Sequence, residues 1–111
     1  MAFSWEITPQ KVQNVIKKII EISRPKKLIF FGSYISGHGH LNSDLDILVV
    51  TGDEIENSRK ESVRIRKALN DIIMSMDILV IPESRLKELA DVPGLIYKEA
   101  LETGKVVYES Q

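Results

Sequence analysis

Residues 30–50 read FFGSYISGHGHLNSDLDILVV and carry the strongest fold signal in the chain. One apolar run, which begins at Leu28, ends here at Gly32-Ser33, and a second apolar run extends from Leu45 to Val50. Both runs have the length and composition of buried strands. The loop between them has no room for a full-length helix, which a crossover between parallel neighbours usually contains. The two runs are therefore predicted to form antiparallel neighbouring strands.

Three aspartates stand at the starts of two predicted strands. Asp44 and Asp46 are two positions apart, so their side chains should project from the same face of the second strand. Asp77 opens a third predicted strand, residues 76–81, in a similar setting. Any one of these aspartates, taken alone, is typical of a turn or a strand edge. If the second and third strands pair near their starts, however, the three carboxylates converge.

Three converging carboxylates would repel one another and raise each other's pKa unless a cation lay among them. Hard oxygen ligands favour Mg²⁺ or Mn²⁺. The aspartates therefore predict a site for a divalent cation.

The Gly32-Ser33 pair precedes Asp44 by ten intervening residues. Gly-Ser is a common turn sequence, and alone it would indicate nothing more. Glycine also allows the backbone to approach a phosphate closely. The Ser33 hydroxyl and nearby N–H groups, followed by a short helical turn, would then hold that phosphate. At this spacing from an Asp-x-Asp pattern, the pair predicts a phosphate-binding turn.

The rest of the chain alternates helical and strand patterns. A helix begins at Thr8-Pro9, a cap followed by proline at the first helical position, and ends at Pro25. Further helices are expected over residues 53–73, 83–90 and 93–103, with a short strand over 106–108. This order indicates an α/β or α+β fold, in which helices cover one side of a small mixed sheet. We expect residues 1–111 to form a single domain.

Composition excludes several classes of protein. The chain has 111 residues, 43% hydrophobic and 28% charged, with a net charge of −1, which argues against disorder and against coating of nucleic acid. It has no cysteine, which excludes disulfides and thiol catalysis, and its two histidines are too few for a His₃ zinc site. No apolar run approaches the roughly 18 residues of a membrane span, and the start lacks signal-peptide features. A cytoplasmic protein is expected.

The spacing of these residues resembles the motif of the DNA polymerase β-like nucleotidyltransferase superfamily. The motif consists here of Gly32-Ser33, ten further residues, Asp44-Leu45-Asp46 and a later Asp77. The short chain is similar to the minimal nucleotidyltransferase branch of that superfamily. Members of this branch are often the antitoxin of a toxin–antitoxin pair whose toxin is a HEPN-domain protein. The resemblance covers most of the chain, from the first helix to residues 104–108.

The resemblance implies a polymerase β-like fold and a phosphoryl-transfer site of the two-metal kind. Asp44 and Asp46 would bridge two Mg²⁺ ions, and Asp77 would hold the catalytic ion and assist deprotonation of an acceptor hydroxyl. Gly32 and Ser33 would bind the triphosphate of ATP. The acceptor oxygen would attack the α-phosphorus, so that AMP stays on the acceptor and pyrophosphate leaves.

The sequence departs from the family pattern after Gly32-Ser33. Members commonly carry an arginine soon after this pair, whereas residues 34–36 here are Tyr-Ile-Ser, and only Gly37 keeps the pattern. Arginine is not readily replaced at a bidentate phosphate contact. His38 or His40 would compensate if protonated, although a neutral, solvated histidine is the default at pH 7.

Two functional hypotheses follow. The first is a Mg²⁺-dependent transferase that moves AMP onto a hydroxyl of a protein partner; the resemblance implies a HEPN toxin and a tyrosine. The second is an antitoxin that neutralises its toxin by binding alone, which the missing arginine favours and the three carboxylates oppose. Transfer to a small molecule is a third possibility, but 111 residues leave no room for an acceptor domain. Homo-oligomerisation stays open, and neither a membrane nor a nucleic-acid partner is expected.

Two further patterns concern surfaces. The basic stretch over residues 59–67 indicates a solvated helix face, with an acidic partner or RNA as the alternative ligand. In the last helix, Leu95, Ile96, Ala100 and Leu101 are predicted to lie in the core, and Tyr97 in the core or at an interface.

Overall fold

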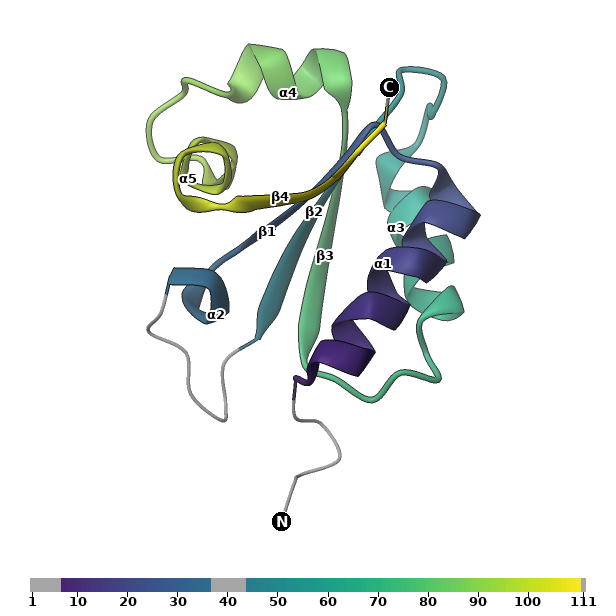
Figure 1. Ribbon diagram of the computed structural model, residues 1–111. Coiled ribbons are helices and arrows are strands. Elements are labelled where there is room, and N and C mark those ends of the chain that lie inside the picture. The colour runs from purple at the N-terminus through teal and green to yellow at the C-terminus, as the bar shows by residue number, and fades with distance from the viewer. Residues whose placement is uncertain (1–6, 37–43, 111) are drawn as a thin grey trace.

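A four-stranded mixed sheet forms the centre of the molecule (Figure 1). The computed structural model describes residues 7–36 and 44–110. The strand order is β3-β2-β1-β4; β1 is antiparallel to β2 and β4, whereas β2 and β3 are parallel. The strands are β1 (Lys27–Phe31), β2 (Leu45–Thr51), β3 (Met76–Pro82) and β4 (Lys105–Glu109). The predicted class and the antiparallel pairing of the first two strands are confirmed.

Helices cover both faces of this sheet, so the expectation of helices on one side was wrong. The helices are α1 (Pro9–Ser23), α2 (Ser33–Ser36), α3 (Ser58–Ala68), α4 (Glu83–Leu89) and α5 (Ile96–Thr103). α1 and α3 lie on one face, and α4 and α5 on the other (Figure 1). The reason is in β1, where Leu28 and Phe30 enter the first core and Ile29 and Phe31 the second. A strand that is apolar at every position must be covered on both sides.

The ends of α1 follow the predicted signals. The Thr8 hydroxyl accepts a hydrogen bond from the Lys11 backbone N–H at 3.2 Å, and Pro9 occupies the first turn. Arg24 ends the helix in the left-handed conformation, just before Pro25. Among the helices within the described residues, none is long and apolar enough to cross a membrane.

α3 is shorter than the predicted helix over residues 53–73. Its first turn is capped by Asn57, whose side chain accepts a hydrogen bond from the Lys60 N–H at 3.0 Å. Of the residues before this cap, 53–54 form a turn and 55–56 have no regular secondary structure, and the chain after Leu69 turns toward β3. The predicted range therefore merged a helix with the loops on either side of it.

α5 is also shorter than predicted, because Gly94 adopts a φ of +85° and the helix starts only at Ile96. Ala100 is buried as predicted, and Tyr97 packs against the second core. Three predicted core residues are instead more than a third exposed: Leu95, Ile96 and Leu101. A two-turn helix buries only a narrow stripe, which here consists of Tyr97 and Ala100.

Candidate active site

Three strand ends meet at one end of the sheet. Because β1 is antiparallel to β2, the end of β1 lies beside the start of β2, where Phe31 pairs with Asp46. Because β2 and β3 are parallel, their starts also lie together, and Asp46 is the register partner of Asp77. Gly32 directly follows β1. The condition set by the sequence, that the second and third strands pair near their starts, is therefore met.

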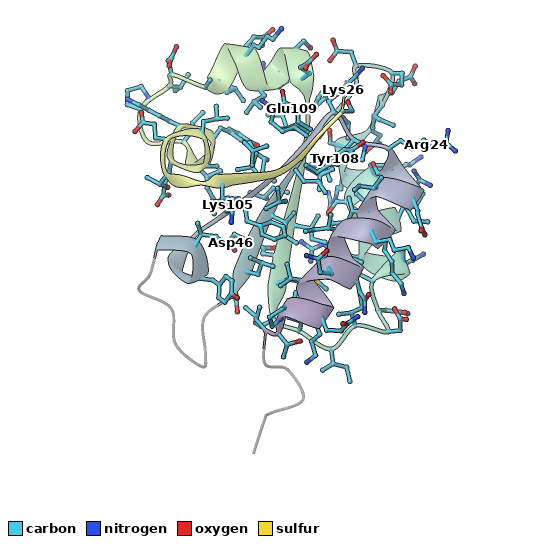
Figure 2. All side chains as sticks on the ribbon, viewed as in Figure 1. Arg24, Lys26, Asp46, Lys105, Tyr108 and Glu109 are labelled. Carbon is cyan, nitrogen blue, oxygen red and sulfur yellow. The ribbon has the colours of Figure 1, made fainter. Side chains whose placement is uncertain are left out.

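The side chain of Asp46 lies on the α4/α5 face of the sheet. Leu45, Ile47 and Val49 enter the core under α1 and α3, as predicted, whereas Leu48 and Val50 belong to the other core. Strand alternation therefore assigns Asp46 to the face of Leu48 and Val50. Figure 2 shows Asp46 at the start of β2, near α2.

The environment of Asp46 disfavours its charged form. Burial raises the pKa of this carboxyl, and the negative charges of Asp77, Asp44 and Glu99 raise it further. Asp77 and Asp44 thus both act electrostatically on Asp46. Glu99, on α5, is a fourth carboxylate near this site that the sequence did not indicate.

Gly32 is required by its contact with Asp46. Its φ of +90° lies in a region that L side chains rarely adopt, and a Cβ atom here would overlap the Asp46 carboxylate. The Gly32 carbonyl accepts a hydrogen bond from the Ile35 N–H at 3.1 Å as the chain enters α2. Ser33 is the first residue of this helix, so the short helical turn predicted after Gly32-Ser33 is present.

Asp44 and Asp77 each have a partner in the protein. The Ser75 hydroxyl donates a hydrogen bond to Asp44. The Arg66 guanidinium donates to Asp77 Oδ1 at 3.0 Å and forms an ion pair with it. The predicted aspartates are therefore brought to one place, but not all of their side chains point to a common centre.

The donor set suits a hard divalent cation, since it consists of carboxylate oxygens within electrostatic range of one another. Within residues 7–36 and 44–110, however, no group of three or more such side chains is arranged to hold a metal ion as it stands. Asp77 points to Arg66 instead. For all three aspartates to hold one cation together, the Asp77 carboxylate would have to turn away from Arg66.

Sequence reasoning missed Arg66, Ser75 and Glu99. Arg66 belongs to the basic stretch that was interpreted as a solvated face, and its pairing with Asp77 depends on how α3 lies along β3. Arg64, from the same stretch, binds Glu61 and the Ile22 carbonyl. The two predicted alternatives for a phosphate cation, His38 and His40, lie outside the described residues, as does Gly37.

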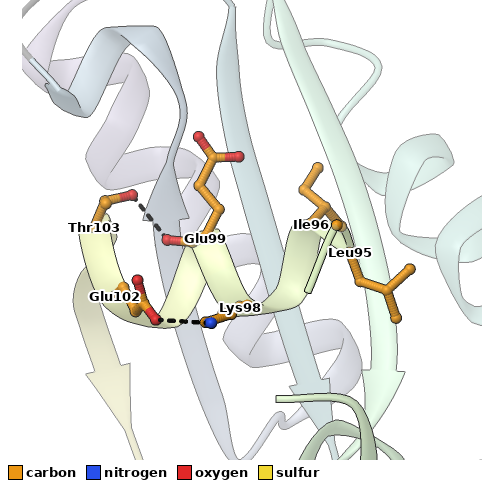
Figure 3. Close-up of a pocket in the computed structure, with 7 residues that line it drawn as sticks. Leu95, Ile96, Lys98, Glu99, Glu102 and Thr103 are labelled. Carbon is orange, nitrogen blue, oxygen red and sulfur yellow. Dashed lines mark hydrogen bonds and ion pairs between the residues drawn. The ribbon is translucent and has the colours of Figure 1, made fainter. Parts of the chain in front are cut away.

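A pocket lies along α5 (Figure 3). This helix covers the face of the sheet that carries Leu48 and Val50, to which strand alternation also assigns Asp46. Among the residues that line the pocket, Lys98 and Glu102 form an ion pair at 4.0 Å, and the Thr103 hydroxyl donates to the Glu99 carbonyl at 2.8 Å. Its lining is formed by Gly94, Leu95, Ile96, Lys98, Glu99, Glu102 and Thr103. Glu99 thus belongs both to this pocket and to the surroundings of Asp46.

The fold is that of a nucleotidyltransferase domain. The family model for polymerase β nucleotidyltransferases matches residues 10–111, and the chain belongs to that family. No curated protein is significantly similar to it in sequence.

Solved structures share the fold. A proposed nucleotidyltransferase from Sulfolobus solfataricus is 16% identical, with a TM-score of 0.64 over 90% of this chain and 78% of that one. A toxin–antitoxin structure with AMP-PNP is 25% identical, with a TM-score of 0.55 over 89% of this chain and 74% of that one. The structure of a toxin–antitoxin MntA–HpeT mutant is 23% identical, with a TM-score of 0.54 over 89% of this chain and 74% of that one.

Proposed function

We propose that this protein transfers AMP from ATP to a hydroxyl group of a protein partner and releases pyrophosphate, in a reaction that depends on Mg²⁺. The observation that carries the proposal is the register pairing of Asp46 with Asp77, beside Gly32 and two residues after Asp44. Membership of the nucleotidyltransferase family supports the same reaction class.

Each site residue has a role in this reaction. Asp44, Asp46 and Asp77 would hold Mg²⁺, which when bound supplies the positive charge that offsets the triphosphate. The backbone at Gly32 and Ser33 receives the phosphates, because glycine leaves the main chain open to close approach. The acceptor oxygen forms a bond to the α-phosphorus while the bond to the pyrophosphate oxygen breaks. Asp77 is the carboxylate that takes the acceptor's proton.

The relatives support the choice of nucleotide and partner. One toxin–antitoxin structure contains AMP-PNP, an ATP analogue, which favours ATP as the donor. Both toxin–antitoxin structures favour a toxin as the acceptor. From the family resemblance, we propose a HEPN-domain toxin modified on a tyrosine. The α5 pocket, which shares Glu99 with the surroundings of Asp46, is where that partner would reach the site.

The test is an adenylylation assay with α-labelled ATP and Mg²⁺, with and without the protein encoded next to this one, read by intact-mass analysis. We expect the partner to gain the mass of one nucleoside monophosphate. The Asp44→Asn/Asp46→Asn double variant should abolish this gain, because it removes two of the metal-binding carboxylates. The Asp91→Asn variant, which changes an exposed aspartate in the turn after α4, should keep it.

A second candidate function is neutralisation by binding alone. Two observations favour it: Asp77 is engaged by Arg66, and residues 34–36, which directly follow Gly32-Ser33, contain no arginine. In that case the assay would give a stable complex with the partner but no adduct, and the double variant would bind as tightly as the wild type.

A further inference from the structure

Arg66 reaches from the last turn of α3 around the edge of the sheet. β3 is an edge strand, and the Arg66 guanidinium donates to its Ile78 carbonyl at 3.2 Å. The same Nη2 donates to Asp77 Oδ1 at 3.0 Å, and Nε lies 3.4 Å from the Ser62 hydroxyl. One side chain therefore joins a helix, the strand backbone and the third carboxylate of the candidate site.

This contact sets the direction of the Asp77 side chain. The Cα of Asp77 lies beside that of Asp46, yet its carboxylate pairs with a cation supplied by the protein. The Arg66 and Asp77 side chains are 52% and 56% exposed. An ion pair this exposed is weak, so a divalent cation between carboxylates can displace it.

We propose that Arg66 is a positioning residue for the metal site: it holds the Asp77 carboxylate at the sheet edge in the metal-free protein and releases it when a divalent cation binds. This inference rests on the proposed function, because it concerns the same three aspartates. It explains why the donor set has the right chemistry while no group of three carboxylates within the described residues is ready to hold a metal. Arg66 and the cation compete for one carboxylate.

Direct Mn²⁺ binding, measured by calorimetry on the full chain without nucleotide, tests the competition. Arg66→Ala removes the competitor, and the Mn²⁺ affinity should rise about 2- to 10-fold, the factor that corresponds to an exposed ion pair plus one repelling charge. Arg66→Lys keeps the positive charge but loses the planar guanidinium. Its Mn²⁺ affinity should therefore lie between those of the wild type and Arg66→Ala.

Lys67→Ala is the matched control. It removes the same charge from the next residue of α3, an exposed side chain for which the described residues provide no hydrogen bond or ion pair. Its Mn²⁺ affinity should change less than that of Arg66→Ala. Thermal unfolding of each variant confirms that the comparison is made between folded proteins.

Mg²⁺ titration followed by NMR gives a second measurement. The Arg66 Nε resonance should shift with Mg²⁺ saturation, whereas that of Arg85, paired with Glu88 at 2.8 Å on α4, should not. Unchanged or weaker Mn²⁺ binding by Arg66→Ala would overturn the inference and leave the metal site standing. If neither the wild type nor Arg66→Ala bound Mn²⁺, the metal site and the inference would both be wrong.

Discussion

At the scale of single residues, the candidate site depends on a glycine and a carboxylate that share one small space. Gly32 turns the chain out of β1 with a positive φ, and the Asp46 carboxylate occupies the volume that a side chain at position 32 would need. Asp46 is in turn surrounded by other negative charges and partly buried. Both features oppose stability and are expected at sites that bind cations and phosphates.

Gly32→Ala should be more destabilising than strain alone explains. A non-glycine residue at positive φ costs about 1–2 kcal/mol, and the overlap with Asp46 adds to this. Gly94→Ala is the matched control, because Gly94 has a similar φ of +85° but open space where a Cβ would lie. Urea denaturation should show a larger loss for Gly32→Ala than for Gly94→Ala. Equal losses would mean that the contact with Asp46 has no energetic effect.

Asp46→Asn should stabilise the metal-free protein. It removes a charge that burial and three neighbouring carboxylates disfavour, and we expect a gain of up to about 1 kcal/mol at pH 7. The same variant should lose the stabilisation by MgATP that mass action gives the wild type. Thermal unfolding with and without MgATP measures both effects, with Asp91→Asn as the control. A destabilised Asp46→Asn protein would contradict this electrostatic account.

At the scale of secondary-structure elements, a buried carboxylate fastens α3 to the end of α1. Glu61, only 6% exposed, accepts hydrogen bonds from Arg64 Nε at 2.9 Å and from the Ser23 hydroxyl at 2.5 Å. Arg64 also donates to the Ile22 carbonyl at 2.8 Å. The hydrogen bond from Arg64 lowers the pKa of Glu61 and outweighs burial, which raises it; Ser23 lowers it further.

This contact predicts a loss of stability in acid. Because the folded-state pKa of Glu61 lies below its ordinary value of 4.5, its contribution is complete above that value and is lost as the pH falls through the folded-state pKa. Glu61→Gln should cost about 1–3 kcal/mol at pH 7 and much less in acid. Urea denaturation at pH 7 and in acid measures this difference in the free energy of unfolding, with the exposed Glu56→Gln variant as control. A pH-independent difference would exclude the charge of Glu61 as the cause.

The elements also show what the sequence could predict. The strands and the first helix followed from apolar runs and a Thr-Pro cap, which are local signals. The meeting of Asp46 with Asp77 was expected only on the condition that the second and third strands pair near their starts. Local signals did not predict the second layer of helices. They also did not predict the exposure of three residues in or beside α5, because the burial of a short helix depends on what it packs against; these residues are Leu95, Ile96 and Leu101. The pairing of Arg66 with Asp77 was missed for the same reason. It joins two elements whose relative placement the sequence pattern does not contain.

At the scale of the whole molecule, one sheet separates two cores. Ile47 and Leu48 are consecutive on β2 and fully buried, the first under α1 and α3 and the second under α4 and α5. Both cores therefore share the same two central strands. We infer that neither core can unfold while the other remains intact.

Ile47→Ala and Leu48→Ala should each destabilise the protein by about 2–5 kcal/mol, because each leaves a cavity in a packed core. Both variants should unfold in one transition, with the same midpoint by circular dichroism and by NMR signals from either face. Leu95→Ala, at a position 38% exposed, should change stability far less. Separate midpoints for the two faces would show that the cores are independent.

The pairing of β4 with β1 has a consequence for the order of folding. β1 and β2 follow each other in the chain, so they can pair early in folding. β4 can pair with β1 only after a loop of about eighty residues has closed, which makes this contact slower to form. The hairpin that carries Gly32 and Asp46 would then exist in the folding nucleus, and β4 would dock after the rate-limiting step. Changes in β4, such as at half-exposed Val106, should accelerate unfolding and leave the folding rate nearly constant. The part of the chain that carries the chemistry would be the first to take shape.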